Sequence, residues 1–170
     1  SVQTTLTPVY GRLLAAIGSE EFGSTVRDAV LGTTAGAHRI YLFEATGREH
    51  STLQYLHGEA GLKELLPAYR TSYHRIDPIC DAYQAAPRLG DVALLRIRPD
   101  DITSHGFRRR FFDDAAIIER SSIMQRGDEG WRVLNVARHR RNGYAAPDEL
   151  DRLIGIACLA LPMLPLNRTH

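Results

Sequence analysis

Two apolar runs flank a short polar segment between residues 116 and 138. The runs contain Ile117, Ile118, Ile123 and Met124, then Trp131, Val133, Leu134 and Val136. The glycine-bounded residues 126–130 between them have the length and composition of a hairpin loop. Both runs are apolar at odd and even positions, which is typical of strands covered on both faces. We therefore predict that this hairpin forms the middle of a sheet.

A second hairpin is predicted at residues 39–57, with its tip at Gly47. Aliphatic and aromatic side chains alternate along the first strand: Ile40, Tyr41, Leu42 and Phe43. The pleat of a strand places the two aromatic side chains on one face. The return strand carries Leu53 and Tyr55 on one face and Leu56 on the other. Residues 92–97 predict an edge strand, which brings the sheet to five strands.

Helical spacing of apolar residues predicts helices at residues 7–17, 19–31, 62–73, 78–83, 104–112 and 147–161. Thr7 and Pro8 suit the first turn of the first helix, and Asp77 is placed to cap the helix that Pro78 begins. Pro67 should kink the third helix. The predicted fold class is α+β, an α-β-α sandwich. One antiparallel sheet carries the terminal helices on one face and the middle helices on the other.

Composition and charge narrow the kind of protein. The chain has 170 residues, 44% hydrophobic and 24% charged, with a net charge of +1. We expect a single domain over residues 1–170, without the overall field that recruits nucleic acid or a membrane surface. No stretch approaches the ~20 apolar residues of a membrane span. Cys80 and Cys158 lack metal-ligand spacing and predict free thiols in a reducing cytoplasm. Because the chain starts at Ser1, we expect it to be cut from a longer protein.

The C-terminal third resembles GAF domains, of the PAS/GAF group of sensor folds. The strand at 131–141 (WRVLNVARHRR), the turn after it and the next helix (YAAPDELDRLIGIACLA) are similar to the closing strand and helix of those domains. Glu149 and Leu153 keep their places in that pattern, and Tyr144 and Ala145 replace the usual aromatic residue and serine. The resemblance implies a GAF/PAS-like five-stranded sheet and a regulatory role.

The middle of the chain resembles the N-terminal sensor domains of LuxR-type bacterial transcription regulators, at residues 69–79 (YRTSYHRIDPI) and 107–123 (FRRRFFDDAAIIERSSI). That group includes acyl-homoserine-lactone receptors, whose pocket carries aromatic residues ahead of an Asp-Pro pair. The resemblance implies a small organic ligand, and DNA binding only through a helix-turn-helix domain beyond residue 170. Acyl-lactone receptors also carry tryptophans near the tyrosine pair, whereas Trp131 is the only tryptophan here. The ligand class therefore stays open.

Tyr69, Tyr73 and Asp77 are each four residues apart and would share one face of a continuous helix. Two phenols and a carboxylate in apolar surroundings could hydrogen-bond the polar head of a ligand. In the alternative interpretation, Asp77 only caps the helix after it and the tyrosines pack in the core.

A second group of candidates should line the sheet face below those tyrosines: Tyr41, Phe43, Tyr55, Trp131 and Asn135. An aromatic surface with one amide suits a small-ligand cavity. A packed aromatic core is the alternative, and a register slip of one residue would exchange the two faces.

Four polar residues interrupt the apolar first arm of the central hairpin: Glu119, Arg120, Ser121 and Ser122. Polar side chains at such positions need partners. Either serine could line the pocket, and we take Ser121 as the candidate; the alternative is a strand with one hydrated stretch.

The sequence contains no catalytic signature, and its seven histidines have no metal-ligand spacing, so we expect neither an enzyme nor a metal or cofactor. The basic runs at 108–110 and 138–141 are offset by nearby acidic residues and predict solvated surface. The last helix is apolar nearly all round, which predicts a homodimer. These features favour a cytoplasmic small-molecule sensor domain that signals through its last helix. The alternative is a ligand-free GAF-like dimerisation or interaction module.

Overall fold

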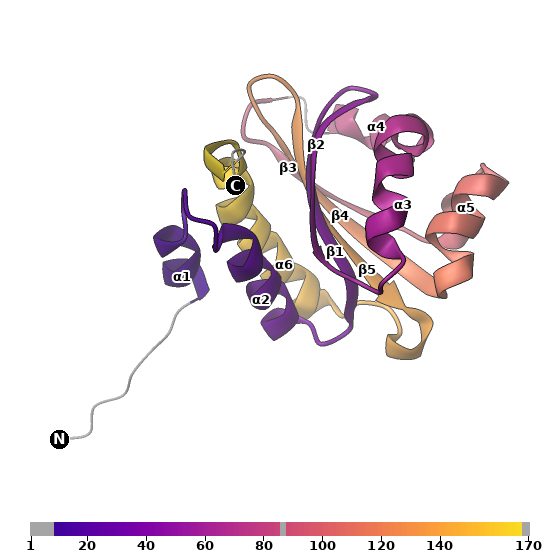
Figure 1. The fold of residues 1–170 in the computed structure, drawn as a ribbon, viewed down its shortest axis with the longest axis horizontal. Coiled ribbons are helices and arrows are strands. Elements are labelled where there is room, and N and C mark those ends of the chain that lie inside the picture. Colours follow the sequence, from indigo (N-terminus) through magenta and orange to yellow (C-terminus); the bar gives the residue numbers. More distant parts are fainter. Residues whose placement is uncertain (1–8, 86–87, 168–170) are drawn as a thin grey trace.

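A computed structural model describes residues 9–85 and 88–167 (Figure 1). The expected first-turn residues Thr7 and Pro8 lie outside the described residues. The helices and strands are α1 (Val9–Ala15), α2 (Phe22–Thr33), β1 (Ala37–Thr46), β2 (Glu49–His57), α3 (Leu62–Ala68), α4 (Ile79–Ala82), β3 (Val92–Ile97), α5 (His105–Phe111), β4 (Ile117–Arg126), β5 (Trp131–His139) and α6 (Pro147–Ala160). A π-helical turn, Tyr69–Tyr73, follows α3 directly.

The five strands form one sheet in the order β2-β1-β5-β4-β3, and all neighbouring pairs are antiparallel. The β4–β5 hairpin therefore lies inside the sheet with β5 at its centre, as predicted, and β3 is an edge strand. Helices α1, α2 and α6 cover one face, and α3, α4 and α5 cover the other (Figure 1). The predicted α-β-α sandwich is confirmed.

The strand register decides which side chains meet each helical layer. Tyr41 pairs with Asn135, and Ala45 pairs with Trp131, so these residues face the middle helices. Leu134 and Val136, on the alternate positions of β5, belong to the core beneath the terminal helices. Both assignments agree with the prediction. A shift of one residue in the register would move every side chain of the strand to the opposite face, so the burial of both faces fixes the register.

Two predicted helices have different bounds in the structure. The second helix begins at Phe22 rather than Ser19, because the Ser19 hydroxyl donates to the Ala16 carbonyl (2.8 Å) and closes a separate turn. The helix predicted at 62–73 changes to π geometry at Tyr69, shortly after Pro67, which lacks an N–H for the helical hydrogen bond. Among the described residues, no helix is long and apolar enough to cross a membrane.

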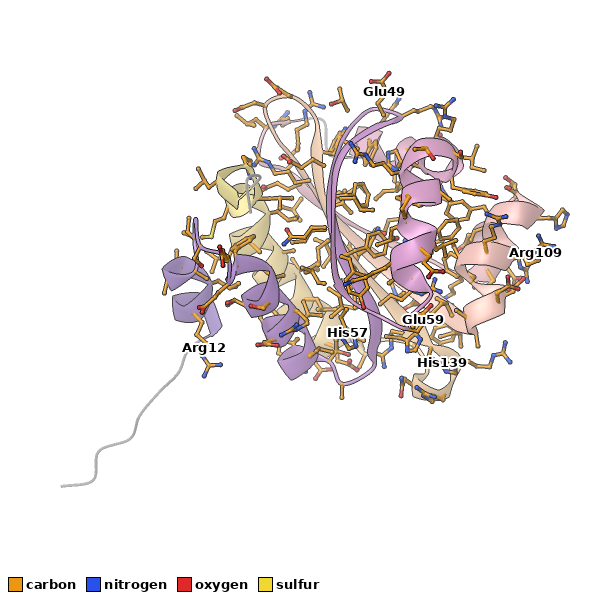
Figure 2. The ribbon with its side chains drawn as sticks, viewed as in Figure 1. Arg12, Glu49, His57, Glu59, Arg109 and His139 are labelled. Atoms are coloured by element: carbon orange, nitrogen blue, oxygen red, sulfur yellow. The ribbon has the colours of Figure 1, made fainter. Side chains whose placement is uncertain are left out.

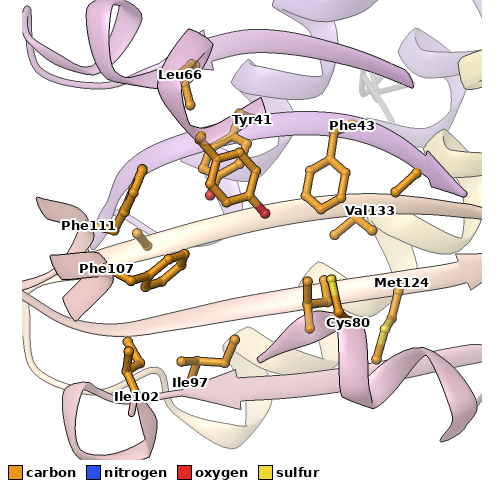
Figure 3. Packing of buried hydrophobic residues seen from close by; sticks show 14 of the residues in the cluster. Tyr41, Phe43, Leu66, Cys80, Ile97, Ile102, Phe107, Phe111, Met124 and Val133 are labelled. Atoms are coloured by element: carbon orange, nitrogen blue, oxygen red, sulfur yellow. The ribbon is translucent and has the colours of Figure 1, made fainter. Parts of the chain in front are cut away.

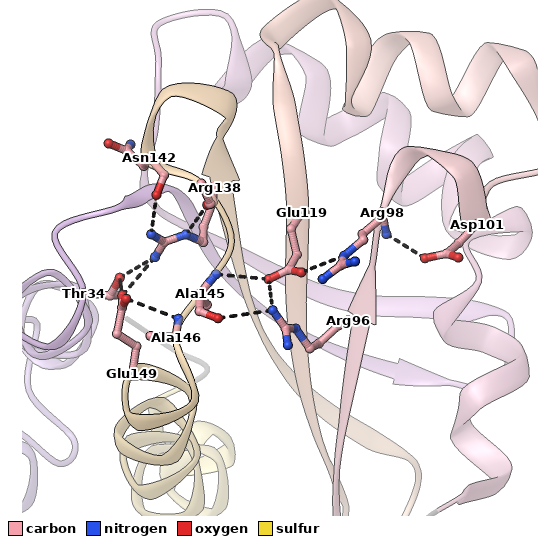
Figure 4. Close-up of polar contacts among 11 residues, drawn as sticks. Thr34, Arg96, Arg98, Asp101, Glu119, Arg138, Asn142, Ala145, Ala146 and Glu149 are labelled. Atoms are coloured by element: carbon pink, nitrogen blue, oxygen red, sulfur yellow. Dashed lines mark hydrogen bonds and ion pairs between the residues drawn. The ribbon is translucent and has the colours of Figure 1, made fainter.

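Two charged clusters fix the start of α6 to the sheet (Figure 4). Arg138 of β5 donates to Glu149 of α6 (3.0 Å) and to the hydroxyl of Thr34 (2.7 Å), and Thr34 also donates to Glu149. The pKa of Glu149 is lowered, mainly by the hydrogen bond from Thr34. Partial burial raises this pKa, whereas the hydrogen bond from the Ala146 N–H and the charge of Arg138 lower it further.

The second cluster is centred on Glu119 of β4, whose side chain is fully buried. Arg96 of β3 and Arg98, which follows that strand, donate to its two oxygens at 2.9 and 3.1 Å. The Ala145 N–H, just before α6, also donates to Glu119, and the Ala145 carbonyl accepts from Arg96 (Figure 4). The loop that leads into α6 is thus held through main-chain groups of Ala145 to side chains of edge strand β3 and of its neighbour β4.

The depressed pKa of Glu149 predicts a pH dependence of stability. A carboxylate with a lowered folded-state pKa contributes stability that is present above its unfolded pKa and is lost as pH falls through the folded pKa. We expect Glu149→Gln to lower the free energy of unfolding at pH 7 and to flatten its decline between roughly pH 5 and 3. Urea unfolding across this range measures both effects. Asp151→Asn, at an exposed position of the same helix, is the control; an equal flattening there would contradict the assignment.

Candidate ligand-binding site

A buried ion pair between Asp77 and Arg120 lies at the centre of the layer between the sheet and the middle helices. The two Arg120 terminal nitrogens donate to the two Asp77 oxygens at 2.7 and 2.8 Å, and both residues are at most 3% exposed. Asp77 Oδ1 also accepts the N–H of Ile79 (2.9 Å), so it caps the start of α4 as predicted. The capping role and the site role of Asp77 are therefore compatible.

Tyr69 reaches the same carboxylate from the π-helical turn. Its hydroxyl donates to Asp77 Oδ2 at 2.8 Å and lies 3.1 Å from Nδ1 of His74. The π geometry is visible in the backbone, where the His74 N–H bonds the carbonyl of Tyr69, five residues earlier. Such turns are frequent at functional sites. Tyr69 is completely buried.

Ser122 and Asn135 extend the polar cluster across the sheet. The register pairs Ser122 of β4 with Asn135 of β5, and Arg120 lies two residues before Ser122 on the same face. Arg120 Nε donates to the Ser122 hydroxyl (3.0 Å), which donates to Asn135 Oδ1. Ser121 pairs with Val136 and faces the terminal helices, so its predicted place in the pocket is wrong and Ser122 occupies it. The side-chain period of a strand is two residues, and sequence alone did not fix its phase.

Some hydrogen-bond donors of this cluster are not used within it. Asn135 is fully buried, and its Nδ2 makes no hydrogen bond of regular geometry to the described residues, although the amide lies close enough to Tyr41 to oppose the rise that burial causes in the Tyr41 pKa. Arg120 uses three of its N–H groups in the bonds given above, and a guanidinium has five. Buried donors left without an acceptor cost free energy. A bound molecule that brought an acceptor would remove that cost.

Aromatic rings from the sheet and from α5, among them Tyr41, Phe43, Phe107 and Phe111, lie in the same layer as the polar cluster (Figure 3). Tyr69 makes edge contacts with Tyr41 and Phe43, with ring centroids 6.1 Å apart in each case. Trp131 stacks on Tyr83 of the turn after α4, at 5.0 Å and nearly parallel. These rings come from β1, β5 and the middle helices, so the predicted aromatic face is present.

The two remaining candidates lie at the margin of this layer. Tyr73 is half-buried, and its ring packs on Phe107 and Phe111 of α5 at 6.2 and 5.2 Å. Tyr55 lies on β2 at the sheet edge, and its hydroxyl donates to the carbonyl of Gly58 (2.9 Å). Both residues lie beside the central cluster, and neither has a hydrogen bond to it among the residues that the structure describes.

The space between sheet and helices is almost completely filled. A cavity of about 10 Å³ remains, with room for roughly one water molecule. Its walls are Arg39, Tyr41, Leu62, Leu66, Phe111, Phe112, Ile117, Arg120 and Ala137. The site as described is therefore closed around its own side chains.

Burial shifts the pKa values of several titratable groups in this layer. Burial, assisted by the charge of Asp77, raises the pKa of Tyr69, and burial likewise raises the pKa of Cys80 to about 11. Burial also lowers the pKa of His74, against the opposing effect of the Asp77 charge. Cys80 Sγ lies 3.8 Å from His74 Nε2, but its raised pKa disfavours a reactive thiolate. Within the described ranges, no three His, Cys, Asp or Glu side chains gather as a metal site.

The basic run on α5 makes local contacts. Arg108 lies within ion-pair distance of Asp100 and Asp113, and Arg110 lies over the ring of Tyr73. Arg109 points away from the sheet on the outer side of α5 (Figure 2). These arginines do not form a separate cationic surface.

Sequence reasoning missed the role of Arg120 and the participation of His74, Cys80 and Tyr83. A signal for Arg120 was available, because an arginine in the middle of an apolar strand needs a buried counter-charge. The partner, Asp77, is 43 residues away, and only the fold brings the two together.

Comparisons with known proteins bear on the fold. No protein-family model matches the chain, and curated protein sequences give no match. Solved structures do match over nearly the whole chain. The VqsR ligand-binding domain from Pseudomonas aeruginosa has a TM-score of 0.62 at 14% identity, covering 95% of this chain and 96% of that one. The N-acylhomoserine lactone dependent LuxR family transcription factor CepR2 from Burkholderia cenocepacia has a TM-score of 0.64 at 16% identity, covering 92% and 88%.

A phycoerythrobilin-bound GAF domain from a cyanobacterial phytochrome also matches, with a TM-score of 0.54 and 13% identity over 96% of this chain and 97% of that one. All three identities are low, so the likeness is one of fold. The chain has the GAF-like fold that LuxR-type ligand-binding domains share, as the sequence resemblance implied.

The buried ion pair predicts a large and coupled loss of stability. Arg120→Met leaves the Asp77 carboxylate without its counter-charge and should lower the free energy of unfolding by about 3–5 kcal/mol. Combining it with Asp77→Asn should cost less than the sum of the two single changes, by about 0.5–3 kcal/mol, because the residues interact directly. Urea unfolding of the four proteins of this cycle measures the coupling.

The pair Arg48–Asp81 supplies the matched control, since it has the same residue types at 3.0 Å but with side chains 59% and 82% exposed. Arg48→Met should cost about 0–1 kcal/mol. A buried cycle with no more coupling than this exposed one would contradict the central role given to Arg120 and Asp77.

Proposed function

We propose that this chain is the small-molecule-sensing regulatory domain of a bacterial LuxR-type transcription regulator. Its ligand binds between the sheet and the middle helices, among Tyr41, Phe43, Tyr55, Tyr69, Tyr73, Asp77, Trp131 and Asn135, with Arg120 and Ser122 added by the structure. The proposal rests on the buried polar cluster within an aromatic layer, where Arg120 has N–H groups beyond those it uses for Asp77 and Ser122. A core that served packing alone would gain stability from apolar residues at these positions.

Signal relay is assigned to α6. Its first turn is bound to β5 through Arg138, and Ala145, just before the helix, is bound to β4 through Glu119, so a shift of these strands would reach the helix. Ligand binding would move α6 only by its difference in affinity for two arrangements of that helix. In this proposal, DNA binding is the task of a separate C-terminal helix-turn-helix domain. The sensor domain itself acts as a cytoplasmic homodimer. Leu14 and Leu166, 52% and 63% exposed in the terminal layer, supply apolar surface for that dimer.

One observation favours a second candidate function, a ligand-free GAF-like dimerisation or interaction module. The cavity beside Arg120 is about 10 Å³, so the site must open before anything larger than a water can bind. In this alternative the polar cluster only fixes how the middle helices sit on the sheet. The two candidates differ in whether any small molecule stabilises the chain.

A ligand screen separates the two functions. The purified chain is heated with a library of metabolites and acyl-homoserine lactones, and native mass spectrometry records any molecule carried through purification. A ligand at a hundred times its dissociation constant stabilises by about 2.7 kcal/mol, which should raise Tm by roughly 5–10 °C in a chain of this size. No stabilising compound and no retained mass would favour the interaction module.

The site assignment is tested with Asn135→Asp, which exchanges the buried amide donor for an acceptor. We expect this variant to fold and to lose most of the ligand-induced increase in Tm. Asn142→Asp, at an exposed position, should respond to the ligand as the unmodified chain does. An unchanged response in Asn135→Asp would move the ligand away from this cluster.

A further inference from the structure

An outer groove lies beside the closed site, between edge strand β2 and α3. Its walls are Leu53, Tyr55, Lys63, Leu66, Pro67, Arg70 and Thr71, and its volume is about 610 Å³. Leu53 and Tyr55 come from the sheet face that carries the aromatic layer, and both pack against that core. The groove is therefore the lateral edge of the same sheet–helix layer that holds Arg120.

Leu66 is shared by the groove and the inner cavity. It lines both spaces and is 3% exposed, pointing from α3 towards Tyr41 and Phe111 (Figure 3). Leu62, one turn earlier on the same helix, lines the inner cavity alone. Between the groove and the donors around Arg120, the Leu66 side chain thus forms part of the dividing wall.

The helix that carries Leu66 is weakened at this point. Pro67 has no N–H, so the helical hydrogen bond to the Lys63 carbonyl is lost. The π-helical turn begins two residues later, at Tyr69. A segment with fewer regular hydrogen bonds opens at lower free energy than a regular helix. Local displacement here would withdraw Leu66 without unfolding the sheet.

We propose that the groove and the inner cavity are two halves of one ligand site, joined when Leu66 moves aside, and that the ligand reaches Arg120 through the gap between β2 and α3. This inference rests on the sensing function proposed above. It names the route by which a ligand enters and Leu66 as the side chain that closes this route. The groove supplies the volume that a ligand needs and that the inner cavity does not have.

The charges around the inner cavity define the class of occupant. Arg120 is paired with Asp77, and Arg39 donates to Glu59 and to the Phe111 carbonyl (3.1 Å), so no unpaired charge awaits a ligand ion. A charged group brought here would be desolvated without a free counter-charge. Arg120 still has N–H groups beyond those it uses for Asp77 and Ser122, and these can donate to an acceptor. The occupant is thus an organic molecule whose inner end is uncharged and carries a carbonyl-type acceptor, and whose outer part lies in the groove.

The route is tested by chemical access to a cysteine placed in the inner cavity, which needs no ligand. Ala137 lines that cavity from β5 and is 3% exposed, so Ala137→Cys adds one sulfur atom facing the space. Uncharged methyl methanethiosulfonate modifies the thiol, and peptide mass spectrometry follows the rate at each cysteine. Adding Leu66→Ala should raise the rate at position 137 by about tenfold or more, because it removes the dividing side chain.

Leu62→Ala is the matched control, with the same atoms removed from the same helix but no opening to the groove. Buried Cys80 reports general loosening of this core, and exposed Cys158 reports intrinsic reagent reactivity. We expect neither the Cys80 rate in Leu66→Ala nor the position-137 rate in Leu62→Ala to rise comparably. Equal acceleration by both leucine changes, or none by Leu66→Ala, overturns the route.

The anionic sulfonatoethyl form of the reagent tests the charge assignment. Relative to Cys158, it should modify position 137 of Leu66→Ala much more slowly than the uncharged form does. Equal relative rates would overturn the uncharged occupant. These measurements use no sensing ligand, so the two proposals are tested separately. The labelling rates can contradict the route, and the ligand screen can contradict the proposed function.

Discussion

The ion pair between Asp77 and Arg120 is the constraint on which the arrangement of this fold depends. Each charge is buried, and either one alone would be costly in an apolar interior. Asp77 belongs to the turn before α4, and Arg120 belongs to β4, so their pairing fixes the middle helices on the sheet. Tyr69 and Ser122 satisfy further hydrogen bonds of the pair and carry the polar contact from the π-helical turn to β5.

The two faces of the sheet consequently have different chemistry. The face beneath α1, α2 and α6 is largely aliphatic, with Ile40, Leu42 and Leu134 among its fully or nearly fully buried side chains. The opposite face is aromatic with a polar centre. Aliphatic packing provides no hydrogen bonds for a polar ligand, whereas the aromatic face combines stacking surfaces with the buried donors of Arg120 and Asn135. This asymmetry locates the candidate site on one side of a sheet that is covered on both.

Adjacent residues of β4 join that site to the terminal layer. Arg120 points into the polar cluster, and Glu119 points the other way, where it holds the Ala145 N–H just before α6. On β5, Asn135 belongs to the polar cluster, and Arg138 donates to Glu149 in the first turn of α6. The central strands therefore contact both the candidate ligand layer and the start of the last helix, which is the connection a sensor domain requires.

The alternation of apolar residues in strands and their helical spacing elsewhere predicted the sheet, its central hairpin and the helices on each face. They could do so because buried faces require apolar residues at regular intervals in the sequence. The aromatic face of Tyr41, Phe43 and Trp131 followed from the same periodicity. Tertiary structure decided what periodicity does not encode. It chose Ser122 over Ser121, since the phase of β4 is set by its neighbours, and it paired Arg120 with an aspartate 43 residues away. It also closed the cavity and left Leu66 between cavity and groove, because side-chain volumes add up only once the layers are packed.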